Sequence, residues 1–230
     1  MTGRALSRIE RAIPDCTRCP ELRAYCAEVA RTKRRAFADW EYWGRPVPGF
    51  GDPLARIWVV GLAPAAHGGN RTGRVFTGDR SGDFLYAALH RAGLANQPTS
   101  VARGDGLALE RVYVSAALRC APPANKPTPR ELENCTNYLD EEEHALREWR
   151  VIVALGGIAW DSVLAMIARR GLARWRKKPK FAHGAEVAIE GERVLFGCYH
   201  VSQQNTFTGR LTPAMIDAVL AAAKVRAGLR

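Results

Sequence analysis

Four runs of apolar, mostly β-branched residues recur along the chain, and each is followed by a segment of helical character. The runs are residues 56–61 (RIWVVG), 112–118 (VYVSAAL), 151–155 (VIVAL) and 193–198 (RVLFGC). A strand that is buried on both faces is apolar throughout, so these runs predict a parallel sheet covered by helices on both sides. We therefore expect an α/β fold, a three-layer α/β/α sandwich with a central, mainly parallel four-stranded sheet.

Helix signals follow each predicted strand. Residues 84–92 and 158–169 have helical periodicity after the first and third runs. Thr128 precedes Pro129 and Glu131, which is the pattern of an N-cap, a proline at the first helical position and a capping-box glutamate. Thr212 and Pro213 give the same kind of start to a C-terminal helix. A chain of 230 residues supports one sizeable core, so residues 1–230 are expected to form a single domain.

Polar loops follow three of the predicted strands, at residues 62–79, 119–127 and 199–210. Sheets of this kind bind ligands at the carboxyl ends of their strands. The three loops are therefore expected to converge on one cleft.

The charge balance narrows the class of partner. The chain has 34 Lys+Arg against 23 Asp+Glu, a formal net charge of +11. This excess favours a polyanion such as DNA, although charge alone does not distinguish a nucleic-acid-binding protein from a merely basic one. No apolar run approaches the ~20 residues of a membrane span, and the first residues lack the apolar stretch of a secretory signal. We expect a cytoplasmic, nucleoid-associated monomer of prokaryotic type, without a membrane partner.

Six cysteines in a chain of this kind point to metal binding or catalysis rather than to a disulfide scaffold. Cys16 and Cys19 form a CxxC pair, Cys120 follows the second strand, and Cys135 lies in the next helix. Thiolates suit zinc or an iron–sulfur cluster. The wide spacing of the second pair favours a cluster, and zinc stays open. Cys198, within an apolar strand, is interpreted as a small buried hydrophobe.

Several specific motifs occur together in this chain. In chain order they are Cys16-x-x-Cys19, residues 61–68 (GLAPAAHG), residues 70–74 (NRTGR), residues 76–79 (FTGD), residues 119–123 (RCAPP) with Cys135, and residues 200–206 (HVSQQNT). Taken together, these motifs resemble the family 5, or type b, branch of the uracil-DNA glycosylase superfamily, over nearly the whole chain. The resemblance implies the same sandwich fold and the excision of uracil and other deaminated bases from DNA. It also implies a [4Fe–4S] cluster held by Cys16, Cys19, Cys120 and Cys135.

With this resemblance, Asp79, Asn125 and His200 become the expected catalytic residues. Asp79 is expected near the sugar, where a carboxylate offsets developing positive charge; the alternative is that Asp79 or Ser81 caps the helix that follows. His200 is expected to donate to a carbonyl of the leaving base. Asn125 is expected to bind water or the nucleotide, with turn formation between prolines as an equal alternative.

The base pocket is expected to contain Gly61, Ala63, Phe76 and Ser115. Phe76 is the stacking candidate, with ordinary core packing as its alternative. Better-known branches have an acidic or amide residue where this chain has Ala63, and an asparagine where Ser115 aligns. Fewer fixed hydrogen-bond partners reject wrong bases less strongly, so hypoxanthine and xanthine are expected substrates beside uracil.

DNA contacts are expected at Arg74, Gln203, Gln204 and Asn205, with the loop at residues 203–210 entering the duplex. Three alternatives stay open. They are a uracil-specific type a glycosylase, a metal-stabilised DNA-binding module without chemistry, and a nucleotide-handling enzyme using residues 68–78. The last is disfavoured because that loop lacks the Gly-Lys-Ser/Thr ending of a P-loop.

Overall fold

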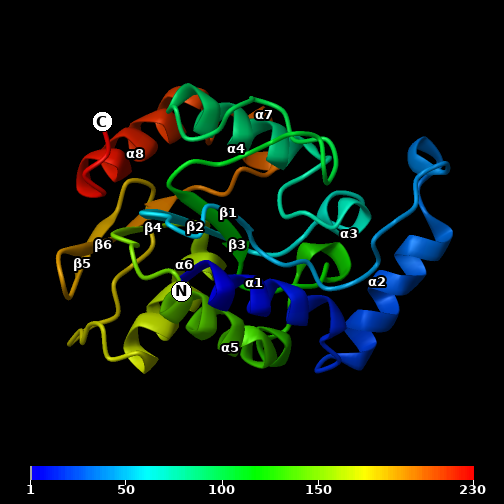
Figure 1. Cartoon of the computed structure of the whole chain (residues 1–230), viewed down its shortest axis with the longest axis horizontal. Helices are drawn as coiled ribbons and strands as arrows, with labels where there is room; N and C mark the ends of the chain where they lie inside the picture. Colours follow the sequence, from blue (N-terminus) through cyan, green and yellow to red (C-terminus); the bar gives the residue numbers. More distant parts are fainter. Residues whose placement is uncertain (1) are drawn as a thin grey trace.

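The computed structural model describes residues 2–230, and at its centre lies a six-stranded sheet in the order β1-β3-β2-β4-β6-β5 (Figure 1). The four inner strands pair in parallel and confirm the four predicted runs: β2 (Ile57–Gly61), β3 (Val112–Ala116), β4 (Val151–Leu155) and β6 (Arg193–Cys198).

Two antiparallel edge strands extend the predicted sheet. They are β1 (Phe50–Gly51), which pairs with β3, and β5 (Glu186–Ile189), which pairs with β6. β1 is too short to produce an alternating pattern, and three of the four residues of β5 are not buried. Neither edge strand therefore has the continuous apolar run that marks the inner four.

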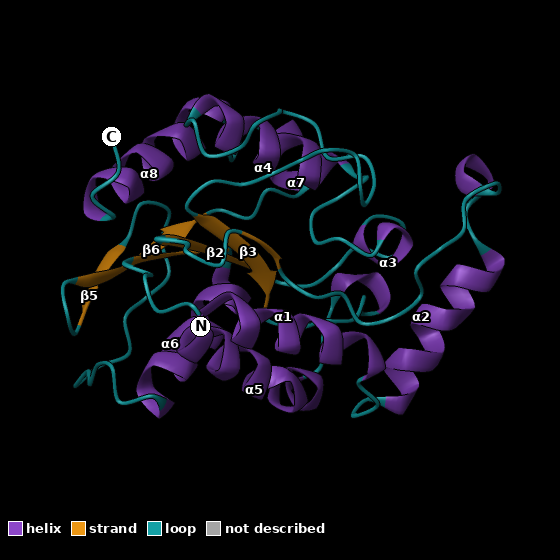
Figure 2. Cartoon of the chain, viewed as in Figure 1, coloured by secondary structure: helices purple, strands orange, loops and turns teal. Residues whose placement is uncertain are grey.

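Helices cover both faces of the sheet and complete the predicted three layers (Figure 2). One layer holds α4 (Arg80–Arg91) and α8 (Pro213–Arg226), which pack against each other. The opposite layer holds α5 (Pro129–Ala145) and α6 (Gly157–Arg169), with α1 (Thr2–Ala12) packed on α5. Within residues 2–230, no helix has both the length and the apolar character that a membrane crossing requires.

The remaining helices are short or lie beside the layers. α2 (Pro20–Thr32) extends away from the sheet on the right of Figure 1, and the 3₁₀ turn η2 (Arg35–Phe37) follows it. The others are η1 (Ile13–Asp15), α3 (Gly69–Thr72), η3 (Pro123–Asn125) and α7 (Gln203–Phe207).

The predicted helix starts are confirmed. Thr128 Oγ1 accepts the Glu131 N–H at 3.2 Å, and the Glu131 carboxylate accepts the Thr128 N–H at 2.7 Å, which completes the capping box of α5. Thr212 caps α8 by accepting the Met215 N–H at 3.4 Å. Each cap satisfies a backbone donor that the first helical turn leaves free.

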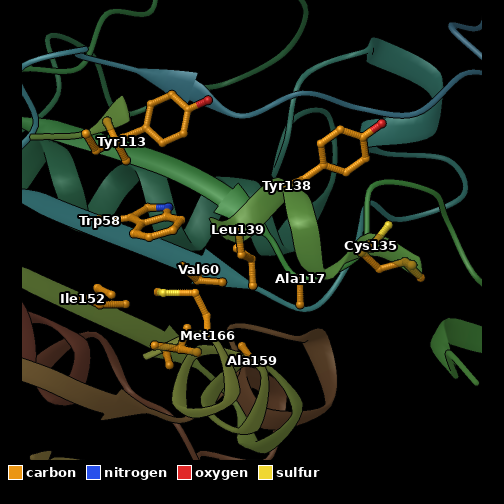
Figure 3. Packing of buried hydrophobic residues seen from close by; sticks show 14 of the residues in the cluster. Trp58, Val60, Tyr113, Ala117, Cys135, Tyr138, Leu139, Ile152, Ala159 and Met166 are labelled. Carbon is orange, nitrogen blue, oxygen red and sulfur yellow. The ribbon is translucent and has the colours of Figure 1, made fainter. Parts of the chain in front are cut away.

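The sheet is buried on both faces because successive side chains of each strand point to opposite layers. Figure 3 shows Trp58 and Val60 of β2 on the face towards α6, where Met166 packs. Ile57 and Val59 of the same strand belong to the core under α4 and α8. Alternation of this kind explains why the inner strands are apolar at nearly every position.

Candidate active site

A cavity of about 620 Å³ lies at the carboxyl ends of β2 and β6, where the predicted loops meet. The loops converge as expected, and most of the predicted site residues line this one space. Those residues are Ala63, Phe76, Asp79, Asn125, His200, Gln203, Gln204 and Asn205.

The helix-cap alternative for Asp79 is confirmed, and the predicted catalytic role stays a prediction that uses its other carboxylate oxygen. Asp79 is the N-cap of α4, and its Oδ1 accepts the Gly82 N–H at 2.9 Å. Its Oδ2 lies against Gly68, where a Cβ atom would overlap that oxygen. Only glycine therefore lets the loop backbone approach the carboxylate this closely.

Burial raises the pKa of Asp79 above its ordinary value, although the backbone N–H groups of Gly82 and Ser81 partly offset that effect. A carboxylate held in such a place carries a desolvation cost at neutral pH. Perturbed carboxylates in clefts are typical of functional sites.

His200 follows β6 and lines the cavity opposite the loop that follows β2. Burial lowers the pKa of His200, so its imidazole is neutral near pH 7 and keeps one N–H to donate. The Asn205 side chain donates to the backbone carbonyl of His200 at 2.8 Å and ties this segment to α7.

Phe76 packs in the core under α4, as its alternative role predicted, and it also lines the cavity, where stacking on a base stays a prediction. Its ring lies on Gly61, where a Cβ atom would overlap it, and its centroid is 6.3 Å from that of His200. Its backbone has a φ of +50°, a left-handed conformation that is costly for a bulky residue. Strain of this kind gathers at functional sites.

Asn125 adopts the turn conformation of its alternative role and also lines the cavity, where its predicted contact with water or the nucleotide stays a prediction. Together with Ala124 it has a positive φ (52° and 56°), which asparagine tolerates in a turn. The residue is exposed and lines the cavity from the side of the loop after β3.

Three residues predicted for the base pocket or for DNA contact do not line the cavity. Gly61 lies behind the ring of Phe76. Ser115 is fully buried within β3, and its Oγ accepts the indole N–H of Trp58 at 2.9 Å, so it does not line the cavity. Arg74, expected to contact DNA, is only 5% exposed and forms a bidentate ion pair with Asp105 (2.7 and 2.8 Å). The guanidinium of Arg74 is thus committed to holding its loop.

The four cysteines of the predicted cluster line one small cavity beside the loop after β3. Cys16 and Cys19 precede α2, Cys120 follows β3, and Cys135 lies on α5. Among the described residues, no three His, Cys, Asp or Glu side chains are grouped closely enough to hold a single metal ion.

Cations surround these thiols. Arg18, Arg23 and Arg119 line the same cavity. Nη1 of Arg23 and both Nε and Nη1 of Arg119 are buried without a hydrogen-bond partner. Four thiols and unsatisfied guanidinium N–H groups around one cavity form a donor set that fits an anionic, thiolate-bound group.

Comparison with known proteins adds independent evidence. A family model described as "Uracil DNA glycosylase superfamily" matches residues 48–224. The chain belongs to the uracil-DNA glycosylase superfamily. It is 54% identical to the "Type-5 uracil-DNA glycosylase" of Thermus thermophilus over 93% of this chain and 94% of that protein. It is 52% identical to the protein of the same description from Mycobacterium leprae, over 98% and 97% of the two chains.

Similarity to another branch of the superfamily is weaker. The "Type-4 uracil-DNA glycosylase" of Archaeoglobus fulgidus is 35% identical over 58% of this chain and 66% of that protein. The family and the branch predicted from the motifs are thus confirmed.

Sequence reasoning missed three features around the cavity. Gly68 was recognised only as part of a motif, although it makes room for Asp79. Phe207, within the loop that is predicted to enter the duplex, is 71% exposed, which is unusual for a large hydrophobe. Arg71 is buried in the lining of the groove next to the cavity. Burial and close approach depend on tertiary packing, so the local pattern held no signal for them.

The two roles of Asp79 are separable by substitution. Asp79→Asn keeps an N-cap and removes the buried charge, so its melting temperature is expected to equal or exceed that of the wild type at pH 7. Asp79→Ala loses the cap and is expected to be less stable than Asp79→Asn by about 1 kcal/mol.

The pH dependence of this comparison follows from the raised pKa of Asp79. A raised carboxyl pKa means that the group's favourable contribution to stability is present at low pH and is lost as pH rises through that pKa. The difference in melting temperature between Asp79→Asn and wild type should therefore grow in favour of the variant as pH rises. Thermal melts from pH 4 to 8 measure this, and an advantage that shrinks as pH rises would contradict it.

Proposed function

We propose that this protein is a DNA-repair glycosylase that hydrolyses the N-glycosidic bond of uracil and other deaminated bases in DNA and leaves an abasic site. The observation that carries the proposal is the pairing of a buried carboxylate, Asp79, with a neutral imidazole, His200, in one cavity beside Phe76. The similarity to proteins described as type-5 uracil-DNA glycosylases supports the same reaction.

The two groups suit the two charges that develop when the bond breaks. The sugar becomes positive, and the Oδ2 atom of Asp79 offsets that charge and orients the attacking water, which adds to the anomeric carbon. The leaving base becomes negative, and the neutral imidazole of His200 donates an N–H hydrogen bond to a base oxygen. Asn125 lies at the mouth of the same cavity, where it binds the water or the nucleotide.

We further propose that the site accepts hypoxanthine and xanthine. Ala63 places a methyl group where a polar side chain would read the base, and the hydroxyl of Ser115 is already occupied by Trp58. A cavity with few fixed donors and acceptors leaves few groups unpaired when a different base enters.

Oligonucleotides with a single uracil, hypoxanthine or xanthine test both statements. Wild-type protein is expected to release all three bases, revealed by alkaline cleavage at the abasic site. Asp79→Asn, which keeps the helix cap, is expected to release uracil at least about 100-fold more slowly than wild type. Release of uracil alone would restrict the protein to uracil. Well-folded wild type that releases none of the three would instead favour the DNA-binding module.

The short helix α7 is proposed to enter the duplex and fill the space left by the extruded base. Gln203 and Gln204 line the cavity from α7, and the exposed ring of Phe207 ends the same helix. Exposed apolar side chains of this size wedge between base steps in other DNA-bending proteins. The guanidinium of Arg80 lies 6.0 Å from the Phe207 ring and adds positive charge at the same edge.

Removal of the α7 side chains proposed to enter the duplex should slow uracil release from double-stranded DNA selectively. The double variant Gln203→Ala/Gln204→Ala, and separately Phe207→Ala, are expected to release uracil about tenfold more slowly from a duplex, because extruding a base costs a few kcal/mol. Release from single strands should change little, since no pairing has to be broken. Equal effects on both substrates would remove the case for insertion.

The cysteine cavity is proposed to hold a [4Fe–4S] cluster with Cys16, Cys19, Cys120 and Cys135 as ligands. The four cysteines around one cavity and the unsatisfied N–H groups of Arg23 and Arg119 support this assignment. When bound, the cluster supplies a cross-link between the segment before α2, the end of β3 and α5. Base hydrolysis transfers no net electron, so its role is structural.

Cys16→Ser is expected to lose iron and the broad visible absorbance of a cluster, and to melt at a lower temperature than wild type. Cys198→Ala serves as the control for loss of one thiol, because Cys198 is buried in β6, away from the cysteine cavity. Iron analysis and absorbance of the purified proteins measure the outcome. Zinc in place of iron, or full iron content in Cys16→Ser, would overturn the assignment.

A further inference from the structure

A second groove, of about 700 Å³, adjoins the catalytic cavity. The groove and the cavity share Asp79, Asn125 and Gln203 among their lining residues, so the two spaces meet at the carboxylate of Asp79. Its far wall comes from α2, η2 and the segment after them, which extend beside the sheet (Figure 1).

An aromatic pair forms part of this far wall. Phe37 and Trp40 lie edge to face, with ring centroids 6.4 Å apart at 78°, and both are partly exposed. Tyr42, two residues further on, bonds through its hydroxyl to Nδ1 of His67 at 3.1 Å. That contact fixes residues 35–42, the arm after α2, against the loop that follows β2. The aromatic pair therefore has a defined position beside the groove.

Arg71 lies beneath the pair. Its guanidinium carbon is 3.9 Å from the Phe37 ring centroid and 4.1 Å from that of Trp40. Nε donates to the His67 carbonyl and Nη2 to the Gly78 carbonyl, each at 2.7 Å. The residue is 3% exposed and lines the groove, yet its Nη1 is buried with no hydrogen-bond partner.

The state of Arg71 calls for an anionic ligand. A buried cation normally has a carboxylate partner, and a buried N–H without an acceptor is costly. Among the described residues, Arg71 forms no ion pair within 4.0 Å. Arg34 and Arg80 also line the groove and balance the charges of Asp79 and Asp83, so Arg71 leaves the lining with one positive charge in excess.

We propose that this groove binds the nucleotide next to the extruded one in the damaged strand, with its phosphate at Arg71 and its base stacked on Phe37 and Trp40. The inference rests on the proposed function, which places the sugar of the extruded nucleotide at Asp79. Adjacent cations and aromatic faces are how proteins bind unpaired nucleic acid, because every base has a face that stacks. The groove therefore favours a strand whose flanking base is unpaired.

The test combines two variants with a series of shortened substrates. Trp40→Leu and Phe37→Leu keep apolar bulk over Arg71 and remove the stacking face. Each is expected to raise the KM for uracil in single strands about tenfold and to leave kcat unchanged. Trp175→Leu, at a partly buried tryptophan outside the groove, is the control for loss of an aromatic ring.

The shortened substrates show whether the variants lose a nucleotide contact or merely pack poorly. Nucleotides are removed one at a time from each side of the uracil. In wild type, trimming one side is expected to raise KM about tenfold, whereas the Leu variants should lose nothing further, because their contact is already gone. Fluorescence anisotropy with an undamaged oligonucleotide measures the same contact without chemistry.

Each outcome bears on a different statement. If trimming costs the Leu variants as much as it costs wild type, the groove does not bind the flanking nucleotide, while uracil release by those proteins leaves the proposed function intact. If wild type releases no base, the proposed function fails, and anisotropy still decides whether the groove binds nucleic acid. Equal anisotropy for wild type, Trp40→Leu and Phe37→Leu overturns the inference.

Discussion

Parallel pairing of β3, β2, β4 and β6 is the constraint on which the site depends, because it ends all four strands at one edge of the sheet. A parallel neighbour requires a crossover, so the chain returns over one face before each new strand. The loops after β2, β3 and β6 thereby meet although 120 residues separate Asp79 from Tyr199. Side chains from all three then share one cavity without any local signal that they are close.

The same constraint explains which parts were predictable. The four inner strands and the caps at Thr128 and Thr212 follow from local pattern, since burial on two faces and orphan N–H groups leave marks in the sequence. Topology then places the loop after each strand. The edge strands and the arm after α2 have no such pattern, because their place depends on partners distant in the chain.

The individual side chains show where pattern reasoning ends. Asp79, His200 and Phe76 lie on loops that topology brings together, and they line the cavity as expected. Ser115 was placed by alignment, but its neighbour Trp58 on β2 takes its hydroxyl. Arg74 was assigned to DNA from its charge, but Asp105, thirty-one positions later, pairs with it. Facing and pairing arise from tertiary contacts, which composition does not encode.

Three buried arginines then distinguish structural from functional charge. Arg74 and Arg119 have buried or nearly buried carboxylate partners, Asp105 and Glu142, which offset the cost of burying a cation. Arg71 is as buried as these and has only carbonyls and aromatic rings. Arg119, despite its partner, also keeps two nitrogens unsatisfied beside the cysteines. Both deficits lie where an anion is proposed, a thiolate-bound cluster at one and a DNA phosphate at the other. A protein stable enough to tolerate such deficits places them where binding a ligand removes their cost.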